Sequence, residues 1–170
     1  VVYGLSIASA PIVITNALIA GINVWYLTKE LRSHSARGID LGASRIAVDS
    51  PFLRDFVAYH LDDIHRFQPD FRLPEGDDAL AWMLTRDGLP AGLLIGRRHG
   101  STLTVDLDYV LAPYRDSRIG RWLFGPGADT FRAAGITEVR SAGTTGTHRS
   151  YLERIGFRAT PGDDALRLVL

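Results

Sequence analysis

The sequence predicts an α+β or α/β domain whose mixed, mostly antiparallel sheet is flanked by helices, preceded by a hydrophobic helical segment suited to a membrane. Three observations support this prediction. No charged side chain occurs in the first 28 residues. Three apolar runs with strand character follow one another between residues 79 and 112, separated by turns that contain glycine. Segments with the apolar spacing of helices stand on both sides of these runs.

Composition sets broad limits on function. The 170 residues suffice for one ordinary domain and an appendage. Nineteen basic and nineteen acidic side chains cancel, so no overall charge favours a nucleic-acid partner, and we expect none. Cysteine is absent, which excludes a cysteine nucleophile, a disulfide scaffold and a thiolate metal site. Because the chain begins at Val1 and not at methionine, we expect a fragment or a processed form.

Residues 1–32 are predicted to form a transmembrane helical segment. A helix needs about 20 apolar residues to cross a bilayer, and residues 12–27 supply most of one span. Trp25 and Tyr26 lie where an interfacial aromatic belt belongs, and basic residues follow from Lys29 onward. This basic flank predicts that the rest of the chain lies in the cytoplasm. The stretch resembles part of a small bacterial inner-membrane protein, so we expect the inner (cytoplasmic) membrane as its location.

Small and amide side chains on this segment indicate a partner helix. Asn16, Ala20 and Asn23 share one helical face, and Ala17 and Gly21 form a small-xxx-small pair beside it. Amides in hydrocarbon need hydrogen-bond partners, which would favour a helix-mediated oligomer. The alternative is a fully buried helix of a soluble protein. A signal peptide fits less well, because its basic residues precede its apolar core.

The next predicted elements are a linker, a short strand and a helix. Residues 33–44 are rich in serine, glycine and arginine and have no periodicity, so they predict a linker before a domain at 45–170. Residues 45–48 predict a short first strand. Ser50 suits a helix N-cap and Pro51 a first helical residue, and the helix would end before Pro69.

That helix carries two histidines and two aspartates that could suggest a metal site. They are His60, Asp62, Asp63 and His65. Their spacing matches no metal-binding motif, so we interpret them as a solvated helix face and predict no metal site.

The remaining elements alternate in an order that continues to the C-terminus. The glycine-containing turns at 86–88 and 99–101 predict a three-stranded meander. Glycine and proline at 125–127 interrupt the next helix, so a kink or two short pieces are expected there. The predicted elements are strands at 79–85, 91–97 and 103–112, a helix at 119–134, a strand at 137–142, a helix at 147–155, and a hairpin of 157–160 with 165–170.

A strand that leads through a basic loop into a helix forms an anion site. Free backbone N–H groups and the helix dipole attract phosphate, and arginine adds full charges. The loop follows the strand that ends near Pro113. Its residues are Arg115, Asp116, Ser117, Arg118, Ile119, Gly120 and Arg121.

This loop resembles the acyl-CoA-binding motif of the GNAT superfamily of N-acyltransferases, Gln/Arg-x-x-Gly-x-Gly/Ala. Arg115 and Gly120 match two defining positions, and Arg118 replaces the middle glycine. Residues 151–157, Tyr-Leu-Glu-Arg-Ile-Gly-Phe, resemble a second GNAT signature, Phe-Tyr-Glu-Lys-x-Gly-Phe. The order of elements over residues 46–170 is also the GNAT order. The resemblance implies acetyl-CoA or another acyl-CoA as cosubstrate and an amine acceptor.

Transfer of an acyl group from a thioester to an amine requires a base and a proton donor for the leaving thiolate. Asp106 and Asp108 are predicted on one strand face, where two carboxylates raise each other's pKa; the alternative is that both pair with arginines. The resemblance implies that an aromatic side chain near 151 protonates the thiolate. Tyr151 is the first choice and His148 the second; the alternatives are a core aromatic and a structural histidine.

The resemblance also implies where the cosubstrate would lie. Backbone N–H groups near Val110 and Leu111 would meet the thioester carbonyl, and the pantetheine arm would enter between this strand and the next. The loop would hold the phosphates; the alternative for the loop is a solvated basic surface.

Two functions from different classes follow from the sequence. The first is a membrane-anchored, cytoplasm-facing N-acyltransferase that transfers an acetyl or other acyl group from acyl-CoA to an unidentified amine. The second is a catalytically inactive, GNAT-like domain of a small membrane protein that binds acyl-CoA as a sensor or serves as a scaffold. Residues 52–84 carry no chemical signature that would identify the acceptor.

Overall fold

A computed structural model describes residues 10–36, 39–115, 118–142, 146–159, 162 and 165–170. Contacts divide the chain into two compact units, unit 1 (Val1–Ile39) and unit 2 (Asp40–Leu170). Each unit is described by itself.

The described part of unit 1 contains one long helix, α2 (Ala10–Ala36). Within it, the 19 residues Pro11–Lys29 have a mean hydropathy of 1.4, long and apolar enough to cross a membrane. Apolar side chains all along this stretch are exposed, Ile14 and Leu18 among them. The helix extends to Ala36 and the first strand begins at Leu41, so the linker predicted at 33–44 is shorter than expected. Residues 1–9 of the predicted transmembrane segment lie outside the described residues.

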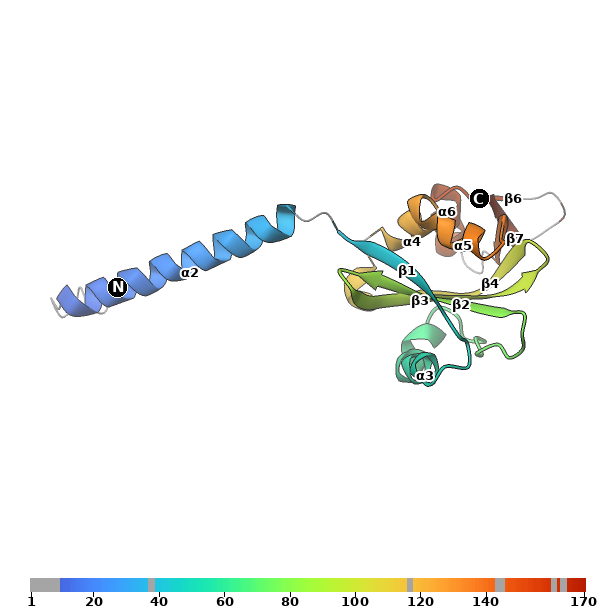
Figure 1. Ribbon diagram of the computed structural model, residues 1–170, viewed down its shortest axis with the longest axis horizontal. Coiled ribbons are helices and arrows are strands. Elements are labelled where there is room, and N and C mark those ends of the chain that lie inside the picture. The colour runs from blue at the N-terminus through green and yellow to red at the C-terminus, as the bar shows by residue number, and fades with distance from the viewer. Residues whose placement is uncertain (1–9, 37–38, 116–117, 143–145, 160–161, 163–164) are drawn as a thin grey trace. The chain divides into compact units, whose positions relative to one another are not determined.

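Unit 2 is built on one seven-stranded sheet with the order β1-β2-β3-β4-β5-β7-β6 (Figure 1). Every neighbouring pair is antiparallel except β4 and β5, which are parallel. This confirms the predicted mixed, mostly antiparallel sheet. The strands are β1 (Leu41–Ile46), β2 (Ala79–Arg86), β3 (Leu89–His99), β4 (Thr102–Val110), β5 (Glu138–Ala142), β6 (Arg158–Ala159) and β7 (Ala165–Val169).

Helices cover the two faces of the sheet unequally. One face is covered by α3 (Pro51–His65) and the other by α4 (Ile119–Leu123), α5 (Asp129–Ala133) and α6 (Gly146–Arg154) (Figure 1). Two separate apolar cores result. The α3 core includes Leu53, Ile64 and Leu107, and the α4–α6 core includes Trp82 and Phe131.

Local signals in the sequence account for the start of α3 and for the break between α4 and α5. The Ser50 side chain accepts a hydrogen bond from the Leu53 amide at 3.2 Å, as expected for the N-cap of α3. Pro51 is the first residue of the helix. The predicted break at 125–127 is present: a 3₁₀ turn, η2 (Pro126–Ala128), separates α4 from α5.

Strand β1 begins four residues before the predicted start. Its ladder with β2 runs from the pair Leu41–Arg86 to the pair Ile46–Ala81. Residues 41–44 have no alternating pattern of their own, and they are extended because β2 offers a pairing edge. Pairing with a distant strand therefore overrides weak local propensity.

One extra residue in β4 decides which side chains face which core. Ile95 pairs with Leu107, but the next residue, Gly96, pairs with Val105, so Asp106 is the additional residue of a β-bulge. Val105 packs against the α4–α6 core, whereas Leu107 lies in the α3 core. The sequence predicted one regular strand here, and that prediction was wrong because a bulge shifts every later side chain to the opposite face.

We expect deletion of Asp106 to unfold unit 2. Without the extra residue, Leu107 and Tyr109 would move to the wrong face and leave the α3 core unfilled. The loss should be comparable to the whole stability of a domain, about 5 kcal/mol or more, in urea unfolding of the full chain.

Asp106→Ala is the matched control, because it keeps the residue count and removes only the side chain. It should cost about 1 kcal/mol. A deletion variant as stable as this one would show that the bulge does not set the faces of β4.

Candidate functional site

The strands β4 and β5 separate beyond a defined point. Their parallel ladder ends at the pair Val105–Ser141, while β4 continues to Val110 and pairs there only with β3. In the described part of the chain, no strand occupies the β5 side of residues 106–110. We call this stretch the open edge of β4. The amides on that side have no strand partner in that part of the chain, whereas the carbonyls of Asp106 and Val110 accept hydrogen bonds from the Gln68 and Arg115 side chains.

Alternate residues of a strand direct their amides to opposite sides. The Leu111 amide donates to the Ala91 carbonyl at 2.9 Å, on the β3 side. The amides of Val110 and Asp108 therefore point toward the open edge. Val110 and Leu111 were the two predicted amide donors to the thioester carbonyl. The Leu111 amide already donates to the protein itself, so its prediction was wrong. The Val110 amide points toward the open edge, as the prediction requires.

Asp108 faces the α4–α6 side of the sheet beside the open edge. Its register partner Leu94 belongs to the α4–α6 core. The carboxyl is partly buried and has no hydrogen bond or ion pair among the described residues. Burial raises the pKa of the Asp108 carboxyl to about 6. Such a group remains mostly ionised at neutral pH and is a stronger base than an ordinary aspartate.

Tyr151 on α6 lies close to Asp108 and directly over Gly120. Burial, and then the charge of Asp108, raise the pKa of the Tyr151 hydroxyl above its usual value. The hydroxyl occupies the space that a Cβ on Gly120 would require. The His148 ring stacks on the Tyr151 ring with centroids 6.3 Å apart, and burial lowers the pKa of His148. The structure thus brings Asp108, Tyr151 and Gly120 together, with His148 at the margin.

Asp106 does not share this site. Its carboxylate accepts hydrogen bonds from Arg97 Nε at 3.0 Å and Arg97 Nη2 at 2.9 Å. Its backbone carbonyl accepts one from Gln68 Nε2 at 3.1 Å. The prediction that Asp106 and Asp108 lie on one face was wrong, because the bulge separates them. Asp106 is instead the arginine partner that the alternative interpretation described.

The predicted phosphate loop is only partly described. Asp116 and Ser117 lie outside the described residues. Arg118 has a φ of 62°, in the left-handed region, at the position where the GNAT motif has glycine. Arg118 and Arg121 are exposed, Ile119 and Gly120 are buried, and no side chain among the described residues caps the N-terminus of α4. The backbone thus adopts the conformation that glycine favours, although arginine occupies the position.

Arg115, the first residue of the motif, is held by the protein itself. Its guanidinium pairs with Asp63 of α3, and its Nε donates to the Val110 carbonyl at 3.1 Å. The Tyr109 hydroxyl donates to the same Asp63 carboxylate at 2.7 Å. That hydrogen bond, and then Arg115, keep the pKa of Asp63 low against the opposing effect of burial. Burial and the bond to Asp63 raise the pKa of Tyr109 to about 12.

This cluster of Asp63, Tyr109 and Arg115 was not foreseen from the sequence. The interpretation of residues 60–65 as a solvated helix face holds for Asp62, which is exposed, but not for Asp63. The two partners of Asp63 are 46 and 52 residues away in the chain. No local pattern carries such information. Among the described residues, no group of three or more His, Asp or Glu side chains is arranged to hold a metal ion.

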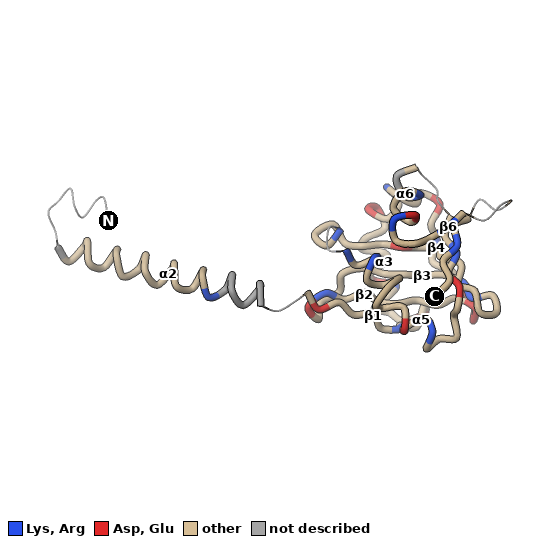
Figure 2. Tube along the Cα trace, turned by 90° about the horizontal axis from the view of Figure 1, so that it is seen from above, with Lys and Arg blue, Asp and Glu red and all other residues tan. Residues whose placement is uncertain are grey.

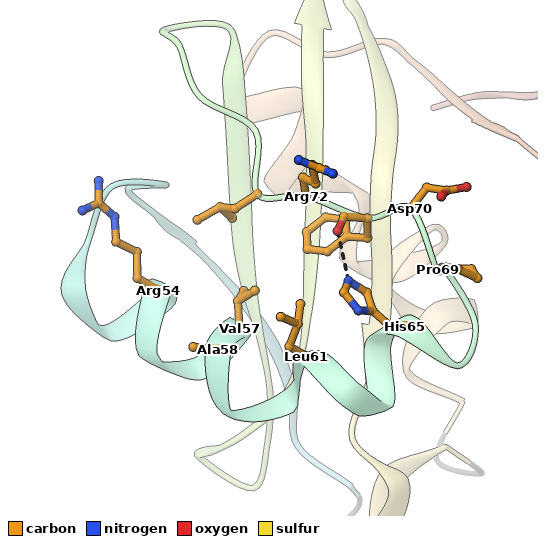
Figure 3. Close-up of a pocket in the computed structure, with 10 residues that line it drawn as sticks. Arg54, Val57, Ala58, Leu61, His65, Pro69, Asp70 and Arg72 are labelled. Atoms are coloured by element: carbon orange, nitrogen blue, oxygen red, sulfur yellow. Dashed lines mark hydrogen bonds between the residues drawn. The ribbon is translucent and has the colours of Figure 1, made fainter.

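Two concave regions lie along the loop that follows α3. A cavity of about 470 Å³ lies beside the end of the β4–β5 ladder, with Val105, Asp106, Ser141 and Ala142 among its lining residues. A groove of about 530 Å³ runs between α3 and residues 69–73. Figure 3 shows this groove and the hydrogen bond between His65 Nε2 and the Phe71 carbonyl, 3.2 Å long, that closes one end. Neither region had a signal in the sequence.

We expect Gly120→Ala to destabilise unit 2 by about 1–3 kcal/mol, because the new methyl group must displace the Tyr151 hydroxyl. Urea unfolding measures the loss. Tyr151→Phe in the same chain removes the clashing oxygen and should recover about half of the loss. Strictly additive effects of the two substitutions would contradict the contact.

The raised pKa of Asp108 also predicts a pH dependence of stability. A carboxyl whose folded pKa of about 6 exceeds its unfolded value of 3.8 destabilises the fold as pH rises through that interval. Asp108→Asn removes this effect. Relative to wild type, its free energy of unfolding should therefore improve by about 1–3 kcal/mol between pH 4 and pH 7. The exposed Asp62→Asn is the matched control; a constant difference for Asp108→Asn would contradict the burial of its charge.

Comparison with known proteins gives a result at the level of structure. No protein-family model matches the sequence, and no curated protein matches it. Solved structures do match. The ribosomal-protein-S18-alanine N-acetyltransferase of Escherichia coli is 21% identical with a TM-score of 0.54, over 77% of this chain and 93% of that one.

Two further structures agree. Tetrahymena GCN5 is 11% identical with a TM-score of 0.56, over 78% of this chain and 96% of its own. An acetyltransferase of the GNAT family from Staphylococcus aureus is 12% identical with a TM-score of 0.52, over 73% and 89%. At these identities the likeness establishes the fold. The chain contains a mixed α+β, GNAT-like fold with a mostly antiparallel sheet flanked by helices.

Proposed function

We propose that this chain is a membrane-anchored, cytoplasm-facing N-acyltransferase that transfers an acetyl or other acyl group from acyl-CoA to an amine. One observation carries the proposal. In a fold shared with acetyltransferases, the partly buried carboxyl of Asp108, which has no hydrogen-bond partner among the described residues, lies beside Tyr151 at the open edge of β4. A base, a proton donor and free backbone amides therefore meet at one place.

Asp108 would act as the base. Nitrogen must lose a proton as it forms the new bond to the acyl carbon, and Asp108 accepts that proton. A carboxyl with a pKa of about 6 is ionised at neutral pH yet holds the proton better than an exposed aspartate. Asp106 has no part in this step, because Arg97 holds its carboxylate.

Val110 and Tyr151 would serve the other half of the reaction. The Val110 amide, directed at the open edge, suits the acyl oxygen as negative charge builds there. When the carbon–sulfur bond breaks, the Tyr151 hydroxyl donates its proton to sulfur. Its raised pKa keeps it protonated at neutral pH. Asp108, which has gained the amine proton, can return it to Tyr151. His148 is the second choice for the proton donor.

The loop from Arg115 to Arg121 would hold the diphosphate. Arg118 and Arg121 are exposed and have no ion pair among the described residues, so their charges are available. Ile119 and Gly120 anchor the loop in the α4–α6 core. Arg115 can contribute only by sharing its guanidinium with Asp63. Acyl-CoA itself supplies the activated thioester.

The membrane location remains part of the proposal. Helix α2 is long and apolar enough to span a bilayer, and Lys29 begins its basic flank. We propose insertion into the inner (cytoplasmic) membrane with unit 2 in the cytoplasm, where acyl-CoA is found. Asn16 and Asn23 then favour a helix-mediated oligomer, because amides in hydrocarbon seek partners.

A specific observation also favours the second function, a sensor or scaffold that binds acyl-CoA without catalysis. Arg115 is neutralised by Asp63, and Tyr151 stands one position before the aromatic residue of the GNAT signature. Isothermal titration with acetyl-CoA, followed by assay of released thiol across a panel of amines, separates the two. Binding without thiol release would favour the sensor; no binding would exclude the transferase and the sensor and leave only a scaffold.

We expect thiol release by the wild-type chain to rise with pH and to level off above an apparent pKa near 6, as Asp108 ionises. Asp108→Asn should lower kcat about 100-fold or more and abolish this rise of the rate with pH, with acetyl-CoA affinity little changed. Asp106→Asn is the matched control and should keep the rise of the rate with pH. An unchanged profile in Asp108→Asn would remove Asp108 as the base.

A further inference from the structure

Four arginines stand in one row across the sheet. The register pairs Arg97 with Thr104, Thr104 with Arg140, Arg140 with Arg167 and Arg167 with Arg158. Residues directly opposite one another point to the same face. The row therefore crosses five strands in the order β3-β4-β5-β7-β6. We call these four residues the arginine row.

The row lies on the α3 side of the sheet. Its neighbours along the strands, Leu103, Val139 and Leu166, are buried in the α4–α6 core, so alternation places the row on the other face. Figure 1 shows α3 over the β2–β3 part of that face. In Figure 2, basic segments of the tube lie beside the labels of β4 and β6.

Acidic side chains partly neutralise the row. Asp106 pairs with Arg97, and Glu138 lies 2.8 Å from Arg140 Nε and 3.3 Å from Arg167 Nε. The charge of Asp78 also acts on Arg97. Arg158 has no carboxylate partner among the described residues; it donates to the Phe157 carbonyl at 3.4 Å. Within the described part of the chain, four cations thus face three carboxylates.

The arginines of the row are more exposed than their acidic partners, so the surface is more positive than the number of charges indicates. The side chains of Arg97, Arg140 and Arg167 are 51%, 42% and 44% exposed. Those of Asp106 and Glu138 are only 17% and 18% exposed. The carboxylates lie beneath the guanidinium groups, so the solvent meets cations. Like charges directly opposite one another on a sheet cost stability, which makes this arrangement costly without an anionic partner.

The row leads into the cavity of about 470 Å³ described above. Arg97 lines that cavity together with Arg72 and the acidic Asp70. Ser141 and Ala142, at the end of the β4–β5 ladder, line it as well. The open edge of β4 begins at that point, and Asp108 lies on the opposite face of the sheet, so an amine would reach it between the two separating strands. A ligand that follows the row therefore reaches the place where the two strands separate.

The length of the row indicates what kind of anion it fits. Four strand spacings of about 4.8 Å give a row of about 19 Å. A single phosphate or carboxylate covers a small part of that distance. An extended polypeptide advances about 3.3 Å per residue, so about six residues span the row. Guanidinium groups suit carboxylates, with which they form bidentate hydrogen bonds.

We propose that the arginine row binds an acidic polypeptide segment of the acceptor, and so presents that acceptor's amine to the open edge of β4. This inference rests on the proposed function for the transfer itself. It adds the substrate class: a peptide or protein rich in Asp and Glu near its reactive amine.

The test uses the full chain in uncharged maltoside micelles. A fluorescein-labelled peptide with six consecutive glutamates is the probe, and the same peptide with six serines is the reference. Fluorescence anisotropy should show the glutamate peptide bound at least about tenfold more tightly, with the difference shrinking as salt rises. Equal affinity for both peptides would overturn the proposal.

The paired variant Arg158→Gln with Arg167→Gln removes two charges and leaves Glu138 paired with Arg140. It should bind the glutamate peptide about tenfold more weakly. The matched control, Arg132→Gln with Arg154→Gln, removes two exposed charges from α5 and α6, outside the row. The control should bind as wild type does. An equal loss of peptide affinity in the row variant and in the control variant would show that the peptide is attracted to positive charge in general. That result would overturn the proposed site.

Two competitors distinguish other anions. Phosphatidylglycerol added to the micelles should not displace the peptide; displacement that disappears in the row variant would assign the row to lipid headgroups. Saturating acetyl-CoA should not displace it either; such displacement would assign the row to the coenzyme. Either result would overturn the proposal.

Thiol release separates this inference from the proposed function. Acidic peptides with a free amine should be acetylated more efficiently than neutral ones, and only the row variant should lose that preference. Acetylation without any such preference would refute the acidic acceptor and leave the transferase standing. Peptide binding through the row without thiol release for any amine would refute the transferase and leave the row as a peptide site.

Discussion

The single extra residue at Asp106 is the constraint on which the site depends. It shifts the later part of β4 by one position, so that Leu107 and Tyr109 fill the α3 core while Asp108 faces the α4–α6 helices. The β4–β5 ladder ends at Val105, directly before the bulge. One irregularity therefore separates the two acids and places the second beside an unpaired strand edge. A bulge next to a site that must aim a side chain is a recurrent device in sheets.

Side chains on both faces of β4 contribute to the candidate site, each through different interactions. On the α4–α6 side, Asp108 is desolvated beside Tyr151, whose hydroxyl fills the space over Gly120. On the α3 side, Asp63 binds both Tyr109 and Arg115, which ties the first helix of unit 2 to the start of the basic loop. A movement of α3 would therefore shift Arg115 at the start of the loop. This coupling is carried by two hydrogen-bonded contacts to one carboxylate.

Two features of unit 2 lower its free energy of unfolding. The partly buried carboxyl of Asp108, which has no partner in the described part of the chain, and arginines placed opposite one another both lower stability, and neither is needed to complete a core. The two cores are dense and apolar, with Trp82, Phe131 and Phe157 fully buried. Such packing lets the sheet carry unfavourable polar groups at its surface and along the open edge of β4. Proteins commonly accept local instability of this kind where a function requires it.

Much of the fold was predictable because its signals are local. A serine cap before Pro51, turn glycines between apolar runs, and the glycine–proline break after α4 act through residues a few positions apart, and the structure confirms each. The order of elements and the basic loop also pointed to the GNAT-like fold, and the apolar residues 12–27 to a helix of nearly membrane-spanning length. The individual loop residues remain predictions.

The sequence by itself thus determined the elements, their order, the long apolar helix and the candidacy of Asp108 and Tyr151. Only the tertiary structure decided that Asp106 belongs to Arg97, that Arg115 belongs to Asp63, and that four arginines form one row. The physical reason is that these facts depend on the register between strands far apart in the chain. A shift of one residue in that register reverses the faces, and no local pattern in the sequence records it.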